Sequence, residues 1–360
     1  MIKIKSVRAE INPSFVNLLK DLFLFIYCLF FGVKSSPNIS REIRENSNFP
    51  NFSKYYQEHI APKNLALEEG RIKKLKKIML ISRAGFISVL TIIVALINYP
   101  TKSINAENIE LFFHLVLLLS SIAIIWLIKI ISAHDLQIKS TLFDKIFYFF
   151  NFHYNASGSE NIAAYEKFSI LPKYDSNLSK TEDLVIGFYK NVKFSLEEID
   201  LRVRSQKNES RQIFRGIVIK LNFNKNFLGK TIVKKDIGIG NFSRKFNSNL
   251  SNLERVLLED IEFEELFAVY SSNQIEARYL LTTSFMERLK KLNSFFKAMS
   301  LEASFVDNFL LLSFETSLNL FEVKSIFYEI NLADETEKTL KEISLIYDLI
   351  DELKLNQKFN

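Results

Sequence analysis

The sequence is poor in cysteine, glycine, proline and histidine, and these shortages exclude several classes of protein. Its single cysteine, Cys28, allows no intramolecular disulfide and no cysteine-rich zinc site, which is typical of a reducing compartment. The chain has no Walker-type glycine-rich loop and no GxSxG elbow, and Gly238–Gly240 is a bare GxG typical of a hairpin turn. None of the four histidines is paired at metal-ligand spacing: His59, His114, His134 and His153. We therefore expect neither a metal nor a cofactor.

Apolar side chains are abundant, and two uncharged runs stand out, Ala84–Asn98 and Leu111–Ile128. A bilayer core requires about 20 apolar residues of helix. The second run is long enough, and the first becomes so if it extends back to Ile78, with Arg83 snorkelling toward the basic flank. Both runs lack the polar stripe of an amphipathic helix, which disfavours the alternative of a buried helical hairpin. The sequence predicts a two-helix transmembrane hairpin over residues 78–132.

The basic residues around the two runs predict the orientation of this hairpin. Arg71–Lys77 precedes the first run, and Lys129, Lys139 and Lys145 come after the second run. Lys102 is the only basic residue of the connecting loop. Because Lys and Arg concentrate on the cytoplasmic side, both termini are predicted to be cytoplasmic. The abundance of Phe, Ile, Lys and Asn is typical of an AT-rich bacterial genome, so we place the chain in a bacterial inner membrane as a multi-pass protein.

The net charge of +6 lies largely in the basic segment beside the first run. Such a segment typically contacts anionic lipid, so the lipid bilayer is an expected partner. The large C-terminal part has no basic helix interleaved with aromatic residues, and we therefore expect no nucleic-acid binding.

The region before the hairpin divides into two predicted parts. Residues 1–53 form an N-terminal extension, in which the 12-residue run Leu22–Val33 is too short to span comfortably. It is interpreted as a membrane-surface or docked helix, a third span, or an extension without fixed structure. Residues 54–77 are predicted to be a basic juxtamembrane helix, interrupted early by Pro62. Glu68, Glu69 and the basic run predict that its later part is a solvated stalk or a membrane-surface helix.

Residues 133–167 are predicted to be a membrane-proximal linker. Its aromatic stretch, Leu142–Phe150, suits either the membrane interface or a place on the following domain.

Residues 168–360 are predicted to form a cytoplasmic α+β domain, because strand patterns come in consecutive runs and helical patterns come late. A hairpin is predicted across Asp307–Asn308, a helix capped by Ser284 with Glu287 follows a capping-box pattern, and a last helix is expected near Glu335–Leu355. The predicted strands are Asp183–Phe188, Val192–Leu201, Phe214–Phe223, Thr231–Val233, Arg255–Leu258 and Glu262–Tyr270. The fold class is therefore a two-helix transmembrane hairpin followed by a mainly antiparallel sheet with C-terminal helices.

Few residues of this chain are candidates for chemistry. His114 lies within the second apolar run, where an ionisable side chain is a functional candidate, although a neutral imidazole is tolerated near the end of a span. Glu276 and Arg278 form a close pair before a helix, which suits either a structural salt bridge or a binding role. A cation site or a solvated face would each account for an acidic cluster of four residues: Asp260, Glu262, Glu264 and Glu265.

The pair lies in a longer string, Phe263–Thr282, followed by Phe285–Leu289. Together with several other stretches, this string resembles a bacterial membrane-protein family known as domain of unknown function 3137. The other stretches are Glu182–Asp183 with Gly187, Phe214–Gly216, Gly229–Thr231, Ser304–Asn308, Tyr55–Tyr56 and Glu68–Arg71. The resemblance covers about residues 54–330. It implies two spans and a cytoplasmic C-terminal domain, and it implies no activity, cofactor or catalytic residue.

The sequence favours a membrane-anchored interaction or scaffold protein, whose domain binds a protein or lipid partner. The alternative is an enzyme acting on a membrane-proximal substrate, which requires a pocket that unites four candidate binding residues: Asp183, Glu276, Arg278 and Asp307. A transporter or channel subunit would require an oligomer, because two spans alone form no pore. Enzymatic activity, the partner and the oligomeric state are left open by the sequence.

Overall fold

The computed structural model describes residues 13–31, 42–43, 48–98, 106–159, 161–205, 209–223, 226–236 and 252–353. The chain divides into two compact units. The first, here called the helical unit, comprises Met1–Leu142 with Val323–Glu335, and the second, the sheet unit, comprises Phe143–Glu322 with Thr336–Asn360. A short segment after the sheet thus belongs to the helical unit, although the chain on both sides of it belongs to the sheet unit.

Two short helical elements precede α3 in the helical unit, and a proline explains why they are separate. α2 (Phe52–His59) ends before Pro62, and a 3-10 turn, η1 (Ala61–Lys63), contains this proline. Proline lacks an N–H donor and disfavours helical geometry in the residue before it, which explains the break. The expected interruption of the 54–77 helix is therefore confirmed. α3 (Asn64–Asn98) then runs without interruption for 35 residues.

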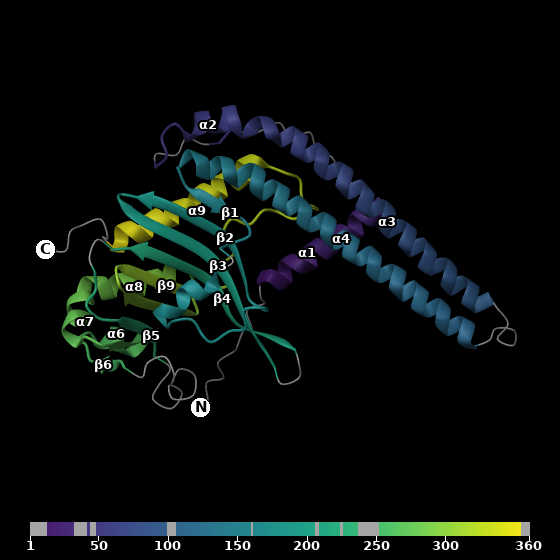
Figure 1. The fold of residues 1–360 in the computed structure, drawn as a ribbon. Coiled ribbons are helices and arrows are strands. Elements are labelled where there is room, and N and C mark those ends of the chain that lie inside the picture. The colour runs from purple at the N-terminus through teal and green to yellow at the C-terminus, as the bar shows by residue number, and fades with distance from the viewer. Residues whose placement is uncertain are drawn as a thin grey trace, which may run out of the picture. The chain divides into compact units, whose positions relative to one another are not determined.

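α3 and α4 (Ala106–Phe149) are long helices that contact each other within the helical unit (Figure 1). Lys74 Nζ donates a hydrogen bond of 2.7 Å to Gln137 Oε1, and Lys77 Nζ lies 4.9 Å from the Trp126 ring centroid. In the part of the chain that the structure describes, one helix is long and apolar enough to cross a membrane, His114–Phe149, and none of its most apolar window is buried. The two-span hairpin is not confirmed, since several side chains of Ala84–Asn98 lie outside the described residues.

α4 continues as a helix beyond the predicted second span. The helix does not stop at Ser132 but continues to Phe149, through most of the predicted linker. No proline or glycine interrupts residues 106–149, so the helical pattern has no stop signal. Of the two places offered for the aromatic stretch, packing on the domain is observed, because Phe147 lies 5.0 Å from Tyr154 and 5.1 Å from Phe321 between ring centroids.

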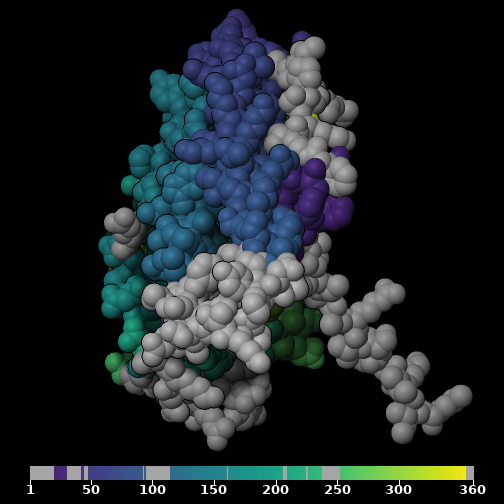
Figure 2. Space-filling view, turned by 90° about the vertical axis from the view of Figure 1, so that its right-hand side faces the viewer, coloured from purple at the N-terminus to yellow at the C-terminus, as the bar shows by residue number. Residues whose placement is uncertain are grey.

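α1 (Pro13–Phe31) contains most of the apolar run Leu22–Val33, whose last two residues lie outside the described ones. Arg83 Nε of α3 donates a hydrogen bond of 2.8 Å to the Leu29 carbonyl, and the Phe30 and Phe86 rings lie 6.2 Å apart. The space-filling view shows α1 (purple) against α3 (blue) (Figure 2). The structure thus shows a helix packed against α3, with Phe23 and Phe30 still more than half exposed, and this contact fits both a docked helix and a third span.

The sequence predicted that Glu68 and Arg71 lie on a solvated stalk or a membrane-surface helix. In the structure both side chains are buried. Arg71 donates to both carboxylate oxygens of Glu68, at 2.8 and 2.6 Å, and its Nη1 donates to the Ile326 carbonyl at 3.0 Å. Glu68 Oε2 also accepts a hydrogen bond from the Ile330 amide at 3.0 Å. No pattern in the sequence indicates residues 323–335 as neighbours, because Ile326 follows Arg71 by 255 residues in the chain. This ion pair holds the 323–335 segment against α3.

The sheet unit has a large antiparallel sheet with strand order β1-β2-β3-β4-β9-β8-β5-β7-β6. Every described pairing is antiparallel, which confirms an α+β fold with C-terminal helices. The strands are β1 (His153–Asn155), β2 (Lys180–Tyr189), β3 (Val192–Arg204), β4 (Ser210–Asn222), β5 (Thr231–Lys235), β6 (Glu254–Val256), β7 (Phe267–Ser271), β8 (Ser300–Val306) and β9 (Phe309–Glu315). The predicted hairpin across Asp307–Asn308 is confirmed, with Asp307 at φ 58°.

Both faces of the sheet are covered, as the near-continuous apolar runs of its central strands require. The 3-10 turn η2 (Ile162–Phe168) and the chain after it pack on one face, where Phe168, Leu201 and Leu311 belong to one buried cluster. α8 (Thr283–Phe295) and α9 (Leu332–Leu353) cover the other face (Figure 1). The Phe296 ring, directly after α8, lies 4.2 Å from Phe314, and Tyr347 of α9 stacks at 3.8 Å on Tyr189.

Two local predictions in this unit were wrong. Residues Glu262–Tyr270 were expected to be one strand, but Ile261–Leu266 form the helix α6, and β7 begins only at Phe267. The carboxylate of Asp260 caps this helix by accepting the Phe263 amide at 2.9 Å. The cap of α8 is Thr282, which accepts the Phe285 amide at 3.3 Å, rather than Ser284.

Candidate functional site

The four candidate binding residues all belong to the sheet unit, but the structure does not bring their side chains together. Asp183 lies in β2, whereas Glu276 and Arg278 lie in α7 (Gln274–Leu280), whose neighbour is the chain entering β5. β2 and β5 are five strand positions apart, which is about 24 Å at roughly 4.8 Å per strand. A catalytic pocket that unites all four residues is therefore not formed.

Glu276 and Arg278 do not form the expected pair. The buried Glu276 carboxylate accepts hydrogen bonds from the amides of Leu228 and Gly229, at 2.9 and 2.8 Å. A side chain at Gly229 would bring its Cβ within 2.7 Å of Asn273, so glycine allows this turn to approach α7 closely. Arg278 is exposed and donates to the carbonyl and the side chain of Gln274. Glu276 thus anchors the 226–230 turn.

Asp307 lies on the other side of the same turn, since its carbonyl accepts the Phe227 amide. Its carboxylate points elsewhere and contacts Lys167 Nζ at 2.7 Å, with both side chains about half exposed. Asp183 is fully buried in a bulge of β2, at φ 54°, and its carboxylate accepts a hydrogen bond from the Tyr154 hydroxyl. Each of these residues fulfils a local structural role.

The acidic cluster predicted near residue 260 is also explained by local contacts. Besides the cap by Asp260, Glu264 accepts the Leu258 amide at 2.8 Å, and Lys290 contacts Asp260 and Glu262 at 3.7 and 3.2 Å. No group of three or more potential metal ligands occurs among the residues that the structure describes. His114 is exposed on α4.

Two buried carboxyl groups in β3 were missed by the sequence analysis. Glu197 accepts hydrogen bonds from the Ser159 amide and hydroxyl and from the Tyr165 hydroxyl, the last at 2.8 Å. Glu198 faces the opposite side of the sheet and accepts the Leu320 amide. Burial raises the pKa of Glu198 to about 9; the hydrogen bond from the Leu320 amide opposes this rise, and the carboxylates of Asp183, Glu182 and Glu322 add to it. The alternation of apolar and polar residues that identifies a strand does not single out either glutamate, because both adjacent positions are polar.

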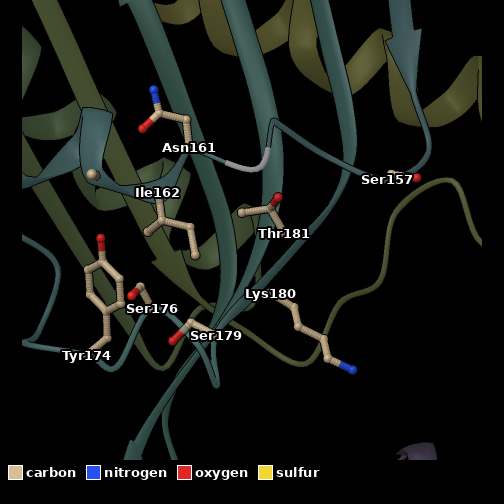
Figure 3. Close-up of a pocket in the computed structure, with 9 residues that line it drawn as sticks. Ser157, Asn161, Ile162, Tyr174, Ser176, Ser179, Lys180 and Thr181 are labelled. Carbon is tan, nitrogen blue, oxygen red and sulfur yellow. The ribbon is translucent and has the colours of Figure 1, made fainter.

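A cavity with a volume of about 400 Å³ lies at the start of β2 (Figure 3). It is lined by Ser157, Asn161, Ile162, Ala163, Tyr174, Ser176, Ser179, Lys180 and Thr181. Tyr174, Ser176 and Ser179 lie on one side of it, whereas the Lys180 side chain extends away (Figure 3).

Short turns position the lining of this cavity. Ser179 Oγ donates to the Asp175 carbonyl at 2.8 Å and accepts the Arg202 amide at 3.0 Å, which ties the 174–179 turn to β3. Gly158, at φ 75°, approaches Thr181 so closely that a Cβ would come within 2.2 Å of its hydroxyl. The Tyr174 hydroxyl donates to Glu166 at 2.9 Å, and burial together with Glu166 raises its pKa to about 12.

The lining of this cavity is polar. It offers hydroxyl groups, the Asn161 amide and the Lys180 ammonium group, and its described residues include no histidine and no carboxylate. The lining therefore suits hydrogen bonds to a small polar group. Its residues come from separate turns and contain no motif, so no pattern in the sequence indicates this cavity.

Comparison with known proteins agrees with the family resemblance over part of the chain. Residues 212–355 match the family model described as protein of unknown function (DUF3137). The matched range begins in β4 and ends after α9, so it does not include the two apolar runs. No curated protein matches the chain. The crystal structure of the mycobacterial trehalose monomycolate transport factor A, TtfA, is similar at 11% identity over 60% of this chain and 94% of that chain, with a TM-score of 0.31. This likeness is too low to carry an argument about fold or function.

Proposed function

We propose that this chain is a membrane-anchored interaction or scaffold protein, in which α3 and α4 form a two-span hairpin and the sheet unit binds a partner in the cytoplasm. The observation that carries the proposal is the exposure of apolar side chains along both helices. Those at least about half exposed include Phe86, Ile87, Val89, Leu90, Ile93 and Val94 on α3, and Leu115, Leu117, Leu118, Leu119, Ile122, Ile124, Ile125 and Ile128 on α4. Apolar surface of this extent is stable in lipid and not in water.

The basic residues in the first half of α3 support cytoplasmic termini. Lys73, Lys76 and Lys77 are exposed, whereas the charge of Arg71 is neutralised by Glu68. The orientation therefore depends on fewer free charges than the sequence suggested, and the three lysines are still sufficient to bias it.

Reporter fusions test this topology. Alkaline phosphatase fused after the last residue is expected to be inactive, and the same enzyme inserted within residues 99–105 is expected to be active, because it folds only in the periplasm. Green fluorescent protein at the same two positions is the matched control and should give the reverse pattern. An active C-terminal phosphatase fusion would show that the proposed orientation is wrong.

The sheet unit also exposes apolar side chains that support a partner-binding role. Ile275 and Tyr279 lie one turn apart on α7 and are 83% and 51% exposed. Leu228, 86% exposed, lies beside them because its amide binds Glu276 of the same helix. These three residues are here called the α7 surface. Since the four candidate residues do not converge, the geometry favours binding over the alternative of an enzyme.

Photo-crosslinking in native membranes tests the binding role. A photoreactive amino acid at Ile275 in the full chain is expected to give a discrete crosslinked protein, identified by mass spectrometry. The same amino acid at Lys341, an exposed position on α9, is the control and should not capture that protein. Identical capture from both positions, or none from Ile275, contradicts a partner at the α7 surface.

A further inference from the structure

Four lysines gather on the face of the sheet that η2 covers in part, and we name Lys167, Lys193, Lys220 and Lys230 the lysine cluster. Lys220 of β4 pairs with Ser195 of β3, two residues from Lys193, so the two lysines share this face as diagonal neighbours. Lys193 also pairs with Phe188 of β2, which is 63% exposed. Lys193 Nζ lies 5.9 Å from the Phe188 ring centroid. The strand register therefore places two lysines on one face of neighbouring strands.

Phe309 of β9 connects the other two lysines to this pair. Lys167 Nζ and Lys220 Nζ each lie 5.2 Å from the centroid of the Phe309 ring. Lys230 Nζ donates to the Lys167 carbonyl at 2.7 Å and to Ser169 Oγ at 2.6 Å, which fixes the backbone that carries Lys167. The cluster thus rests on hydrogen bonds and ring contacts, and it does not depend on freely rotating surface side chains.

The negative charges near the cluster do not balance it. Asp307 contacts Lys167, but both side chains are about half exposed, and such pairs contribute little and exchange readily. The Glu197 carboxylate is already bound by Ser159 and Tyr165. Among the described residues, no ion pair is formed by Lys193 or Lys220.

The electrostatics of Lys220 agree with an uncompensated excess of positive charge. Its side chain is half buried, and this burial, followed by the charges of Lys167 and Lys193, lowers its pKa. Burial and the neighbouring Lys234 likewise lower the pKa of Lys230. Bringing like charges together costs free energy that an anion can offset.

We propose that the lysine cluster binds a phosphate-bearing ligand. Ammonium groups act as point charges toward phosphate, and phosphate presents several oxygens that different lysines can contact at once. A single carboxylate, such as that of Asp307, provides less charge and fewer acceptors. The same chemistry is offered by a soluble phosphate compound and by a phospholipid headgroup. This site shares the 226–230 turn with the α7 surface but none of its three residues, so it adds a ligand to the proposed function and does not depend on it.

The test uses the full chain in phosphatidylcholine nanodiscs at low salt. Inorganic pyrophosphate is titrated by calorimetry, and recruitment to added vesicles is measured with phosphatidylcholine alone or mixed with phosphatidylglycerol. Saturable binding of pyrophosphate without recruitment assigns the site to a soluble ligand, whereas recruitment that pyrophosphate inhibits assigns it to a headgroup. Either binding is expected to weaken as salt rises, since exposed charges are screened.

Two substitutions connect the binding to the cluster. Lys220→Gln and Lys193→Gln are each expected to weaken it about tenfold, and Lys193→Gln changes only an exposed side chain, so it keeps the test valid if Lys220→Gln disturbs folding. Lys341→Gln removes an exposed lysine of α9 and should leave binding unchanged. Absence of binding to both probes, or equal binding by wild type and Lys193→Gln, would overturn the proposal.

Discussion

Replacing Arg71 with alanine is expected to lower the free energy of unfolding of the helical unit by about 3–5 kcal/mol, the loss typical of breaking a buried ion pair from one side. The substitution leaves the Glu68 carboxylate buried without its bidentate partner. It also removes the donor to the Ile326 carbonyl. The 323–335 segment should therefore detach from α3 more often than in the wild type.

Hydrogen exchange of the full chain in detergent micelles measures this effect. Peptides from residues 323–335 should exchange faster in Arg71→Ala than in wild type. Lys73→Ala, two residues away on the same helix and exposed, is the matched control and should exchange as wild type does. A double substitution, Glu68→Met with Arg71→Met, should lose less stability than Arg71→Ala, because no unpaired charge is left behind.

The pH dependence of the same pair has a definite sign. Burial opposes ionisation of Glu68, but hydrogen bonds from Arg71 and the Ile330 amide, together with the charges of Arg71 and His134, outweigh it and place the pKa below the ordinary 4.5. The pair therefore contributes its stability above pH 4.5 and loses it as the pH falls through the lower pKa of the folded state. Faster exchange of residues 323–335 in acid should occur in the wild type and be absent from the double methionine variant. Equal exchange in Arg71→Ala and Lys73→Ala would contradict the stabilising role of the pair.

The elements that local pattern determines were predicted correctly. β4 has apolar residues at every second position from Ile217 to Phe223, and the β8–β9 hairpin has Asp307 at the position that requires a positive φ. The break at Pro62 follows from the covalent structure of proline. Such features depend on neighbours within a few residues, so the sequence alone is sufficient to identify them.

Features that depend on distant partners could not be predicted. Glu68 and Arg71 have the composition of a solvated helix, and only contact with residues 326–330 makes them buried. The residues of α6 alternate as a strand would, but the Asp260 cap and the contacts of Lys290 favour a helix. The lysine cluster depends on strand register across β3, β4 and β9, which the order of residues in the chain does not show.

Glu198→Gln is expected to stabilise the sheet unit at neutral and alkaline pH. Burial keeps Glu198 protonated in the folded protein up to a pKa of about 9, whereas the unfolded chain ionises near 4.5. The neutral carboxyl contributes its full stability below pH 4.5, and this contribution is lost progressively as the pH rises toward 9. At 1.36 kcal/mol per unit, the loss is roughly 3 kcal/mol by pH 7. Glutamine cannot ionise, so the variant should avoid most of this loss.

Glutamine also preserves the contacts of the neutral acid. Its Oε1 can accept the Leu320 amide, and its neutral amide adds no charge near the carboxylates of Asp183, Glu182 and Glu322. Hydrogen exchange of β3 and β4 peptides, compared between variant and wild type at each pH, should show slower exchange in Glu198→Gln at pH 7 and above, and a difference that shrinks toward pH 4.5.

Glu197→Gln is the matched control, since it changes the adjacent residue of the same strand on the opposite face. The Glu197 carboxylate accepts three hydrogen bonds, from the Ser159 amide, the Ser159 hydroxyl and the Tyr165 hydroxyl. Replacing one carboxylate oxygen with an NH2 group sets a donor against these donors, which is expected to cost about 1–3 kcal/mol. Two neighbouring Glu→Gln substitutions should thus change stability in opposite directions. If both destabilise β3 and β4 equally at pH 7, Glu198 is ionised in the folded protein and its surroundings act as those of Glu197 do.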